Sequence, residues 1–156
     1  MSLAIRAATA DDQTAIVGLV HSERLNPHGL DWPNFVVAVD GEALVGAAQI
    51  RRHKDGSREL GSLVVDRSYR RQGLASRLID RLLAGEAGRV LVITGKMRAA
   101  YFARWGFRPI TSGHAPTSIR TNYYLGYMIG GLHALLRRRP VNHLLILDRM
   151  PMSAAE

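Results

Sequence analysis

The chain has 156 residues, which is the usual size of one domain. Hydrophobic residues make up 47% of it and charged residues 22%, which is ordinary for a globular protein and argues against disorder. Cysteine is absent, which excludes a disulfide scaffold, a thiolate nucleophile and cysteine-ligated metal centres. The 21 basic residues outnumber the 13 acidic ones, and the resulting net charge of +8 favours a polyanionic ligand or partner.

The hydrophobic pattern alternates between strand type and helix type along the whole chain. β-branched runs on either side of Asp40-Gly41 indicate a hairpin, and apolar residues at helical spacing indicate helices. There is no repeat and no linker, so we expect one domain of mixed α+β class over 1–156, with a core at 3–110 and a variable region at 111–150. The predicted elements in chain order are a strand at 3–7, a helix that includes 15–20, strands at 35–39, 43–50 and 59–65, a helix at 74–84, a strand at 90–93, a helix at 97–105, an extended segment at 107–110, a helical pattern at 116–136 broken by Gly126, Gly130 and Gly131, and a strand at 144–147.

The most specific feature is a strand, a short basic turn, and a helix that opens at Gly73-Leu74-Ala75. The first backbone N–H groups of a helix lack acceptors and lie at the positive end of its dipole, which makes an anion site. Arg67, Arg70 and Arg71 can add bidentate contacts to phosphate groups. The turn is neither a Walker A loop nor a GxGxxG fingerprint, so ATP and NAD are not favoured. Taken alone, it is equally well explained as a surface turn with solvated arginines.

Four segments together resemble the GNAT (Gcn5-related) N-acetyltransferase family. Residues 70–75 fit its Arg/Gln-x-x-Gly-x-Gly/Ala acetyl-CoA signature, and residues 101–107 fit its aromatic-aromatic-x-x-x-Gly-Phe block. Segments 4–12 and 35–41 are also typical of the family, in the right order and spacing. The resemblance implies a mostly antiparallel twisted sheet of about six to seven strands flanked by helices. It also implies acetyl-CoA as co-substrate. The six histidines include no pair at His-x-x-x-His spacing, so we expect no metal site.

The resemblance further implies which residues hold acetyl-CoA. Backbone amides after the signature strand hold the pyrophosphate, and the strand pairs with the pantetheine arm like an added strand. A backbone N–H near Leu63 polarises the thioester carbonyl. The expected cofactor-binding residues are Leu63, Val64, Val65, Arg70, Arg71, Gln72, Gly73, Leu74, Ala75 and Ser76.

Glu59 and Tyr101 are the candidate catalytic residues. Glu59 begins the signature strand, where several family members carry a catalytic glutamate that deprotonates the amine; a strand-end carboxylate paired with an arginine is the alternative. The family often places its acid, a tyrosine, four residues before the glycine of Gly-Phe, but Phe102 stands there. Tyr101 is one residue earlier, a rotation of about 100° on a helix, so it acts only if the helix is shifted. Otherwise the thiolate leaves unassisted.

We therefore expect an N-acetyltransferase that moves acetyl from acetyl-CoA to the primary amine of a small molecule. Direct attack in a ternary complex is favoured because no cysteine is available to form an acyl-enzyme. A carboxylate-bearing amine such as an amino acid is favoured because a basic protein does not favour polycations. The alternatives are a GNAT-like CoA-binding module with little activity and a basic nucleic-acid-binding protein, against which the 6% aromatic content argues.

The C-terminal third departs most from the family pattern. Candidate acceptor contacts at the start of its helical segment are Arg120, Asn122, Tyr123 and Tyr124. Gly126 and Gly130 favour close helix packing, including in a homodimer. Because no apolar run reaches the ~18 residues that a membrane span needs, we expect a cytoplasmic protein.

Overall fold

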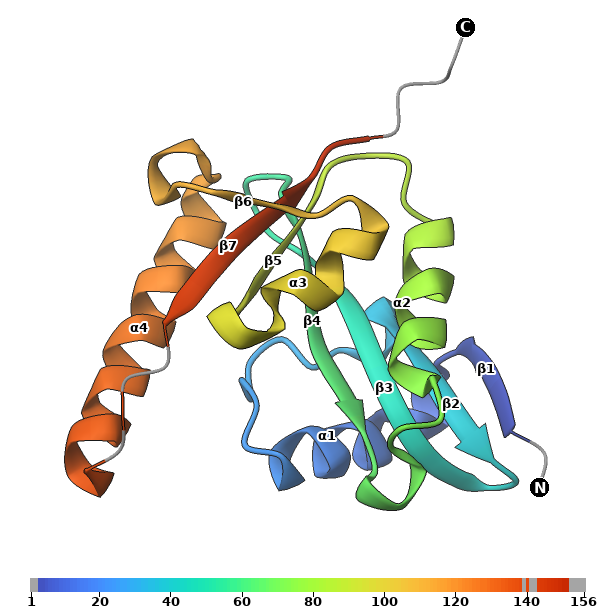
Figure 1. The fold of residues 1–156 in the computed structure, drawn as a ribbon. Helices are drawn as coiled ribbons and strands as arrows, with labels where there is room; N and C mark the ends of the chain where they lie inside the picture. Colours follow the sequence, from blue (N-terminus) through green and yellow to red (C-terminus); the bar gives the residue numbers. More distant parts are fainter. Residues whose placement is uncertain (1–2, 139, 141–142, 152–156) are drawn as a thin grey trace, which may run out of the picture. The chain divides into compact units, whose positions relative to one another are not determined.

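The computed structural model describes residues 3–138, 140 and 143–151, which form seven strands and four α-helices (Figure 1). The chain divides into two compact units. Unit 1 is Met1–Arg51 with Leu60–Ala87, and unit 2 is Arg52–Glu59 with Gly88–Glu156.

Unit 1 contains strands in the order β1-β2-β3-β4. Strand β1 pairs antiparallel with β2, and β2 pairs antiparallel with β3. Gly41, with φ of +60°, makes the tight turn between β2 and β3, as the Asp40-Gly41 pair predicts. The elements are β1 (Leu3–Ala7), α1 (Gln13–Ser22), β2 (Phe35–Asp40), β3 (Ala43–Arg52), β4 (Arg58–Val65) and α2 (Leu74–Ala84), of which the connected ends of β3 and β4 belong to unit 2.

The two helices of unit 1 cover opposite faces of β2. Val37 shares a core cluster with Ile16 and Val20 of α1. The neighbouring residue on the strand, Ala38, lies beside Gly46, which is close to Leu78 of α2. Because successive side chains of a strand point to opposite faces, α1 packs on one face and α2 on the other. The five apolar residues of α2 that the helical spacing marks are all buried; they are Leu74, Leu78, Ile79, Leu82 and Leu83.

Unit 2 contains three further strands in the order β5-β7-β6, and both pairs are antiparallel. Helix α4 packs on them through Ile119, which lies in a core cluster with Leu91 of β5 and Ile146 of β7. Figure 1 shows α4, in orange, running beside β7. The elements are β5 (Val90–Gly95), α3 (Ala99–Phe102), β6 (Arg108–Ile110), α4 (Thr117–Arg137) and β7 (Leu144–Arg149).

Helix α4 differs from the prediction, because its three glycines do not break it. It runs for 21 residues without interruption. A glycine inside a helix costs only about 1 kcal/mol relative to alanine, which packing can offset. At Gly126 the packing is visible, since a Cβ there would lie 3.2 Å from Cδ1 of Leu144 in β7. Gly126 therefore serves the approach of α4 to its own unit. Among the described helices, none is both long and apolar enough to cross a membrane.

The segment predicted as one helix at 97–105 is three short pieces instead. Helix α3 has a single turn between two 3-10 turns, and Gly106, with φ of +81°, ends the run. The six 3-10 turns of the described chain are Ala10–Asp12, Trp32–Asn34, Arg67–Tyr69, Lys96–Arg98, Ala103–Trp105 and Ser112–His114. The expected α+β class with six to seven mostly antiparallel strands is confirmed.

Candidate active site

The basic turn of unit 1 has an unusual backbone. Gly73 has φ of +76° and Arg71 has φ of +63°, so two of its residues are left-handed. Gly73 is the N-cap of α2 and supplies no side-chain cap. A Cβ on Gly73 would meet no atom within 4 Å, so the turn is open at this point. The first N–H groups of α2 have no acceptor inside the helix, and the structure therefore leaves them available to an anion.

Two of the three arginines at this turn share one carboxylate that the sequence analysis missed. Arg70 Nη2 lies 2.8 Å from Glu23 Oε1, and Arg67 Nε lies 3.4 Å from the same oxygen. These bonds, with that of Arg70 first, lower the pKa of Glu23. Arg70 Nε also donates to the carbonyl of Val65 at 3.0 Å, which ties the turn to the end of β4. Within the described chain, Arg71 is exposed and has no ion pair.

Strand β4 is continuous but has a left-handed residue at Ser62, whose φ is +51°. A left-handed residue inside a strand breaks the regular ladder, as a β-bulge does. The Ser62 side chain is buried, and its Oγ accepts from Gln49 Nε2 at 2.9 Å and from Arg51 Nη2 at 2.8 Å. Two donors from β3 thus hold the irregular residue in place. Ser62 lies directly before Leu63, whose backbone N–H is expected to donate to the thioester carbonyl.

Arg51 is positioned by a glycine as well as by Ser62. A Cβ on Gly61 would lie 2.5 Å from Arg51 Nη1, so any side chain there would displace the guanidinium. The guanidinium is half-buried and lies beside the irregular part of β4. Nothing in the neighbourhood of Arg51 along the chain marks it as a functional residue, so its place beside β4 was not predicted.

Glu59 is a buried carboxylate of unit 2, and it is 5% exposed. Its Oε2 accepts from Asn122 Nδ2 of α4 at 3.1 Å and lies 2.8 Å from His53 Nε2. Two of the partners of this carboxylate are therefore an imidazole and an amide. His53 was missed, although it stands just before the predicted Asp55-Gly56 turn that leads to Glu59.

The same turn also caps helix α4. Asp55 Oδ2 accepts from the backbone N–H of Ser118 at 2.8 Å, in the first turn of α4. Bonds from the Ser57 hydroxyl first, and then from the backbone N–H of Ser118, lower the pKa of Asp55 well below its ordinary value. A carboxylate at a helix N-terminus also meets the positive end of the helix dipole. The start of α4 is therefore joined to the turn that carries His53.

Two of the other candidate acceptor contacts, Tyr123 and Tyr124, make hydrogen bonds elsewhere in unit 2. The Tyr123 hydroxyl donates to the carbonyl of Leu144 at 3.4 Å, and the Tyr124 hydroxyl lies 3.0 Å from Ser112 Oγ. Of the four residues expected to contact an acceptor, Asn122 is the one with a hydrogen bond to Glu59.

The rings of Tyr101 and Phe102 of α3 meet edge to face, with their centres 5.6 Å apart. Phe102 is buried, and its ring lies 5.9 Å from that of Phe107. The Tyr101 ring is 5.1 Å from the ring of Trp105, and the Arg104 guanidinium stacks 4.7 Å from its centre. The tyrosine is thus held against a surface of aromatic and cationic groups.

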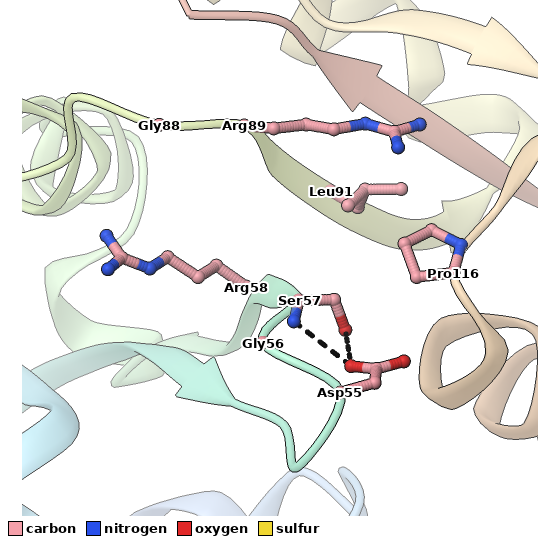
Figure 2. A pocket seen from close by; sticks show the side chains of 8 residues that line it. All are labelled: Asp55, Gly56, Ser57, Arg58, Gly88, Arg89, Leu91 and Pro116. Atoms are coloured by element: carbon pink, nitrogen blue, oxygen red, sulfur yellow. Dashed lines mark hydrogen bonds between the residues drawn. The ribbon is translucent and has the colours of Figure 1, made fainter.

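A pocket of about 410 Å³ lies in unit 2, at the turn between β3 and β4. Figure 2 shows Asp55, Ser57 and Arg58 on one side of it and Arg89, Leu91 and Pro116 on the other. Arg89 makes a forked pair with the buried Asp148, with its closest contact at 2.6 Å from Nη2 to Oδ2. None of the expected site residues lines this pocket. Arg89, which does line it, is paired with Asp148.

Comparisons with solved structures show the same fold in acetyltransferases. N-acetylglutamate synthase from Neisseria gonorrhoeae, solved with coenzyme A and N-acetyl-glutamate, has a TM-score of 0.71 at 18% identity. The match covers 98% of this chain and 36% of that one, so the chain spans about a third of its length. Rv2747 from Mycobacterium tuberculosis, solved in complex with CoA, has a TM-score of 0.69 at 21% identity, with 96% and 99% of the two chains covered.

A GNAT family acetyltransferase from Staphylococcus aureus has a TM-score of 0.63 at 16% identity, with 96% and 99% of the two chains covered. A search of curated protein sequences found no match. The family described as "Acetyltransferase (GNAT) domain" matches residues 31–109, which is half of the chain and includes the whole basic turn. The resemblance found in the sequence is confirmed, and the chain belongs to the GNAT acetyltransferase family.

Proposed function

We propose that the protein transfers an acetyl group from acetyl-CoA to the primary amine of a small molecule by direct attack in a ternary complex. The observation that carries the proposal is the open, left-handed turn at the start of α2, within the part of the chain that matches the family. Such a turn offers N–H groups and cationic side chains to a pyrophosphate.

The residues of this turn fit coenzyme A. The N–H groups of residues 73–76 would hold the pyrophosphate, and Arg70, Arg71 and Gln72 would surround it. Val64 and Leu74 are buried, so they would contribute only their backbone groups. Leu63 to Val65 would pair with the pantetheine arm, and the N–H of Leu63 would donate to the thioester oxygen. Bound acetyl-CoA supplies the activated acetyl group.

Glu59 would act as the general base. A buried carboxylate that already accepts from an amide is fixed in position, and His53 can pass the proton onward because an imidazole has two nitrogens. One proton of the acceptor ammonium would move to Glu59, and the amine nitrogen would then form the new N–C bond at the thioester carbonyl. The nitrogen would lose its second proton to solvent as the C–S bond breaks and the thiolate of coenzyme A leaves. Tyr101 remains the candidate acid for the departing thiolate, with solvent as the other source of that proton.

The acceptor would carry a carboxylate as well as an amine. Arg51 supports this choice, because it places a planar guanidinium beside the irregular part of β4. A guanidinium can bind a carboxylate through two parallel hydrogen bonds. The net charge of +8 favours the same class of substrate. We further propose that the protein acts as a homodimer, and the cytoplasmic location stays a prediction.

Two measurements test the proposal. Acetyl-CoA should raise the unfolding temperature, because a ligand that binds only the folded state stabilises it. Mixing with a library of small amines should then release free thiol, and amino acids should be among the active acceptors. Protection without thiol release would indicate a CoA-binding module instead. DNA binding with a steep salt dependence that persists in saturating CoA would favour the nucleic-acid alternative.

A further inference from the structure

Helix α4 exposes an unusual amount of apolar surface. Seven of its large side chains, spread over three turns, are between 50% and 77% exposed. Isolated exposed apolar residues are ordinary, but a contiguous set on one helix marks an interaction surface. This surface, the α4 stripe, consists of Tyr124, Leu125, Met128, Ile129, Leu132, Leu135 and Leu136.

The α4 stripe lies away from the unit that α4 packs on. The opposite face of the helix carries Ile119, Gly126 and Ala134, and Gly126 is the point of close approach to β7. Within the stripe, Leu125, Met128, Leu132 and Leu135 follow one another at steps of three, four and three residues. This spacing is that of the seam between two packed helices.

The stripe is also symmetric about position 130 of the sequence. Met128 and Leu132 lie two residues to either side, and Leu125 and Leu135 lie five residues to either side. Tyr124 and Leu136 continue the pattern at six residues. An isologous contact requires this property, because residue i must meet residue j of the other copy while j meets i. The steps of three, four and three residues read the same in both directions, so the stripe can meet a second copy of itself in an antiparallel pair.

We propose that the α4 stripe is the contact between two copies of this chain, with the two α4 helices antiparallel about a two-fold axis near residue 130. The inference names the interface of the homodimer proposed above, and it does not depend on the chemistry of the site. Met128 would lie against Leu132 of the partner subunit, and Leu125 against Leu135 of the partner subunit. At these exposures, the seven side chains present an exposed surface on the order of 600 Å². A standard interface buries about 800 Å² on each partner, which is a similar area.

The charge pattern favours this occupant and this direction. A helix that lies on an anionic membrane carries rows of Lys and Arg along its polar face, whereas residues 121–136 contain neither. Three consecutive arginines, Arg137, Arg138 and Arg139, follow the stripe in the sequence, and one, Arg120, precedes it. In an antiparallel pair the two copies of Arg137 and Arg138 lie at opposite ends, while a parallel pair would bring them together between two chains that each carry +8.

The test begins with the mass in solution. The wild-type chain at about 100 µM should sediment at twice 17.2 kDa, and Leu132→Glu should sediment at 17.2 kDa. The matched control is His133→Glu, which adds the same carboxylate to an exposed position of the same helix that is outside the stripe, and it should remain dimeric. The proposal is overturned if the wild type sediments as a monomer or if Leu132→Glu keeps the mass of the wild type. It is also overturned if the wild type is not a dimer and instead co-sediments with phosphatidylserine vesicles.

Cross-linking tests the direction, since the natural chain has no cysteine. In the antiparallel pair the two copies of residue 128 are offset by about 6 Å along the helix axis, and those of residue 121 by about 27 Å. Met128→Cys should therefore give a covalent dimer with a short bismaleimide, and Thr121→Cys should not. Efficient cross-linking through residue 121 would overturn the antiparallel arrangement. Protection of the Leu132→Glu monomer by acetyl-CoA against thermal unfolding shows separately whether the proposed cofactor site stands.

Discussion

Asn122 Nδ2 donates to Glu59 Oε2 at 3.1 Å, although the two residues are 63 positions apart in the chain. The bond joins the first turns of α4 to the beginning of β4 within unit 2. With His53 on the same oxygen, it gives the buried carboxylate a fixed orientation. A base that is held in one orientation loses little entropy when it takes a proton from a bound amine.

Replacing Glu59 by Gln should lower kcat by about 10²- to 10⁴-fold, because general-base catalysis contributes a factor of this size. The amide can still bond to Asn122 and preserves the packing. Coenzyme A binding should be unchanged, as measured by titration calorimetry. Asn122→Ala keeps the base and should cost less than tenfold. Full activity of Glu59→Gln would mean that the carboxylate is structural and that the proton leaves by another route.

Gly73→Glu should abolish coenzyme A binding while the protein stays folded. A carboxylate at the start of α2 repels the pyrophosphate, and the left-handed φ of +76° adds a backbone cost of about 1 kcal/mol for any side chain. Gly73→Ala isolates the backbone part, and Gly113→Glu adds the same charge at a position open to solvent. Both controls should still bind. Tight binding by Gly73→Glu in a thermal-shift titration would show that the pyrophosphate lies elsewhere.

Glu23→Gln should tighten coenzyme A binding several-fold. The carboxylate holds Arg70 at 2.8 Å and competes with a phosphate for that guanidinium. Its removal also makes the turn more positive, so the slope of affinity against salt should become steeper. Glu42→Gln, on the hairpin after β2, changes the net charge equally without touching the arginines and serves as the control. A weaker affinity for Glu23→Gln would mean that the ion pair orients Arg70 productively.

Gly61→Ala should raise KM for carboxylate-bearing acceptors by about tenfold or more and leave the affinity for coenzyme A nearly unchanged. The added Cβ would lie 2.5 Å from Arg51 Nη1, so the guanidinium must move. Arg51→Lys keeps the charge but loses the planar fork, and it should show the same defect. If both variants treat amines with and without a carboxylate alike, Arg51 does not contact the acceptor.

The Arg6–Asp12 pair should contribute to stability near neutral pH but not in strong acid. The hydrogen bond from Arg6 lowers the pKa of Asp12 to about 2, from 3.8. A depressed carboxyl pKa adds stability above the unfolded value, and this stability is lost as the pH falls from about 4 to 2. Allowing for the exposed Arg6, the contribution is roughly 1 kcal/mol. Urea unfolding should separate Asp12→Asn from wild type at pH 7 and not at pH 2; the exposed Asp11→Asn should match wild type at both.

The parts of this fold that were predicted correctly are those encoded by neighbouring residues. Helix α2 follows from apolar residues at helical spacing between Leu74 and Leu83, and the turn after β2 from Asp40-Gly41. Such patterns depend on residues within one or two turns of backbone, so the elements that they predict do not require contacts from distant parts of the chain.

The parts that were missed depend on residues far apart in the chain. Glu23 meets Arg67 from 44 positions away, and nothing near Glu23 indicates that it will lie beside the basic turn. The continuity of α4 through Gly126 depends on contact with Leu144, which outweighs a weak local propensity. His53 is an intermediate case, since the turn at Asp55-Gly56 brings it toward Glu59 and could have drawn notice.

Helix α4 is continuous from its buried contacts to its exposed stripe. Its first turns are bonded to the β3–β4 turn through Asp55 and to Glu59 through Asn122, and the exposed stripe occupies the remaining turns. A rod of 21 residues transmits a tilt from one end to the other, because no hinge absorbs it. The proposed dimer contact and the Asn122–Glu59 bond therefore lie on one continuous helix, so a variant that alters the stripe also tests how firmly Glu59 is held.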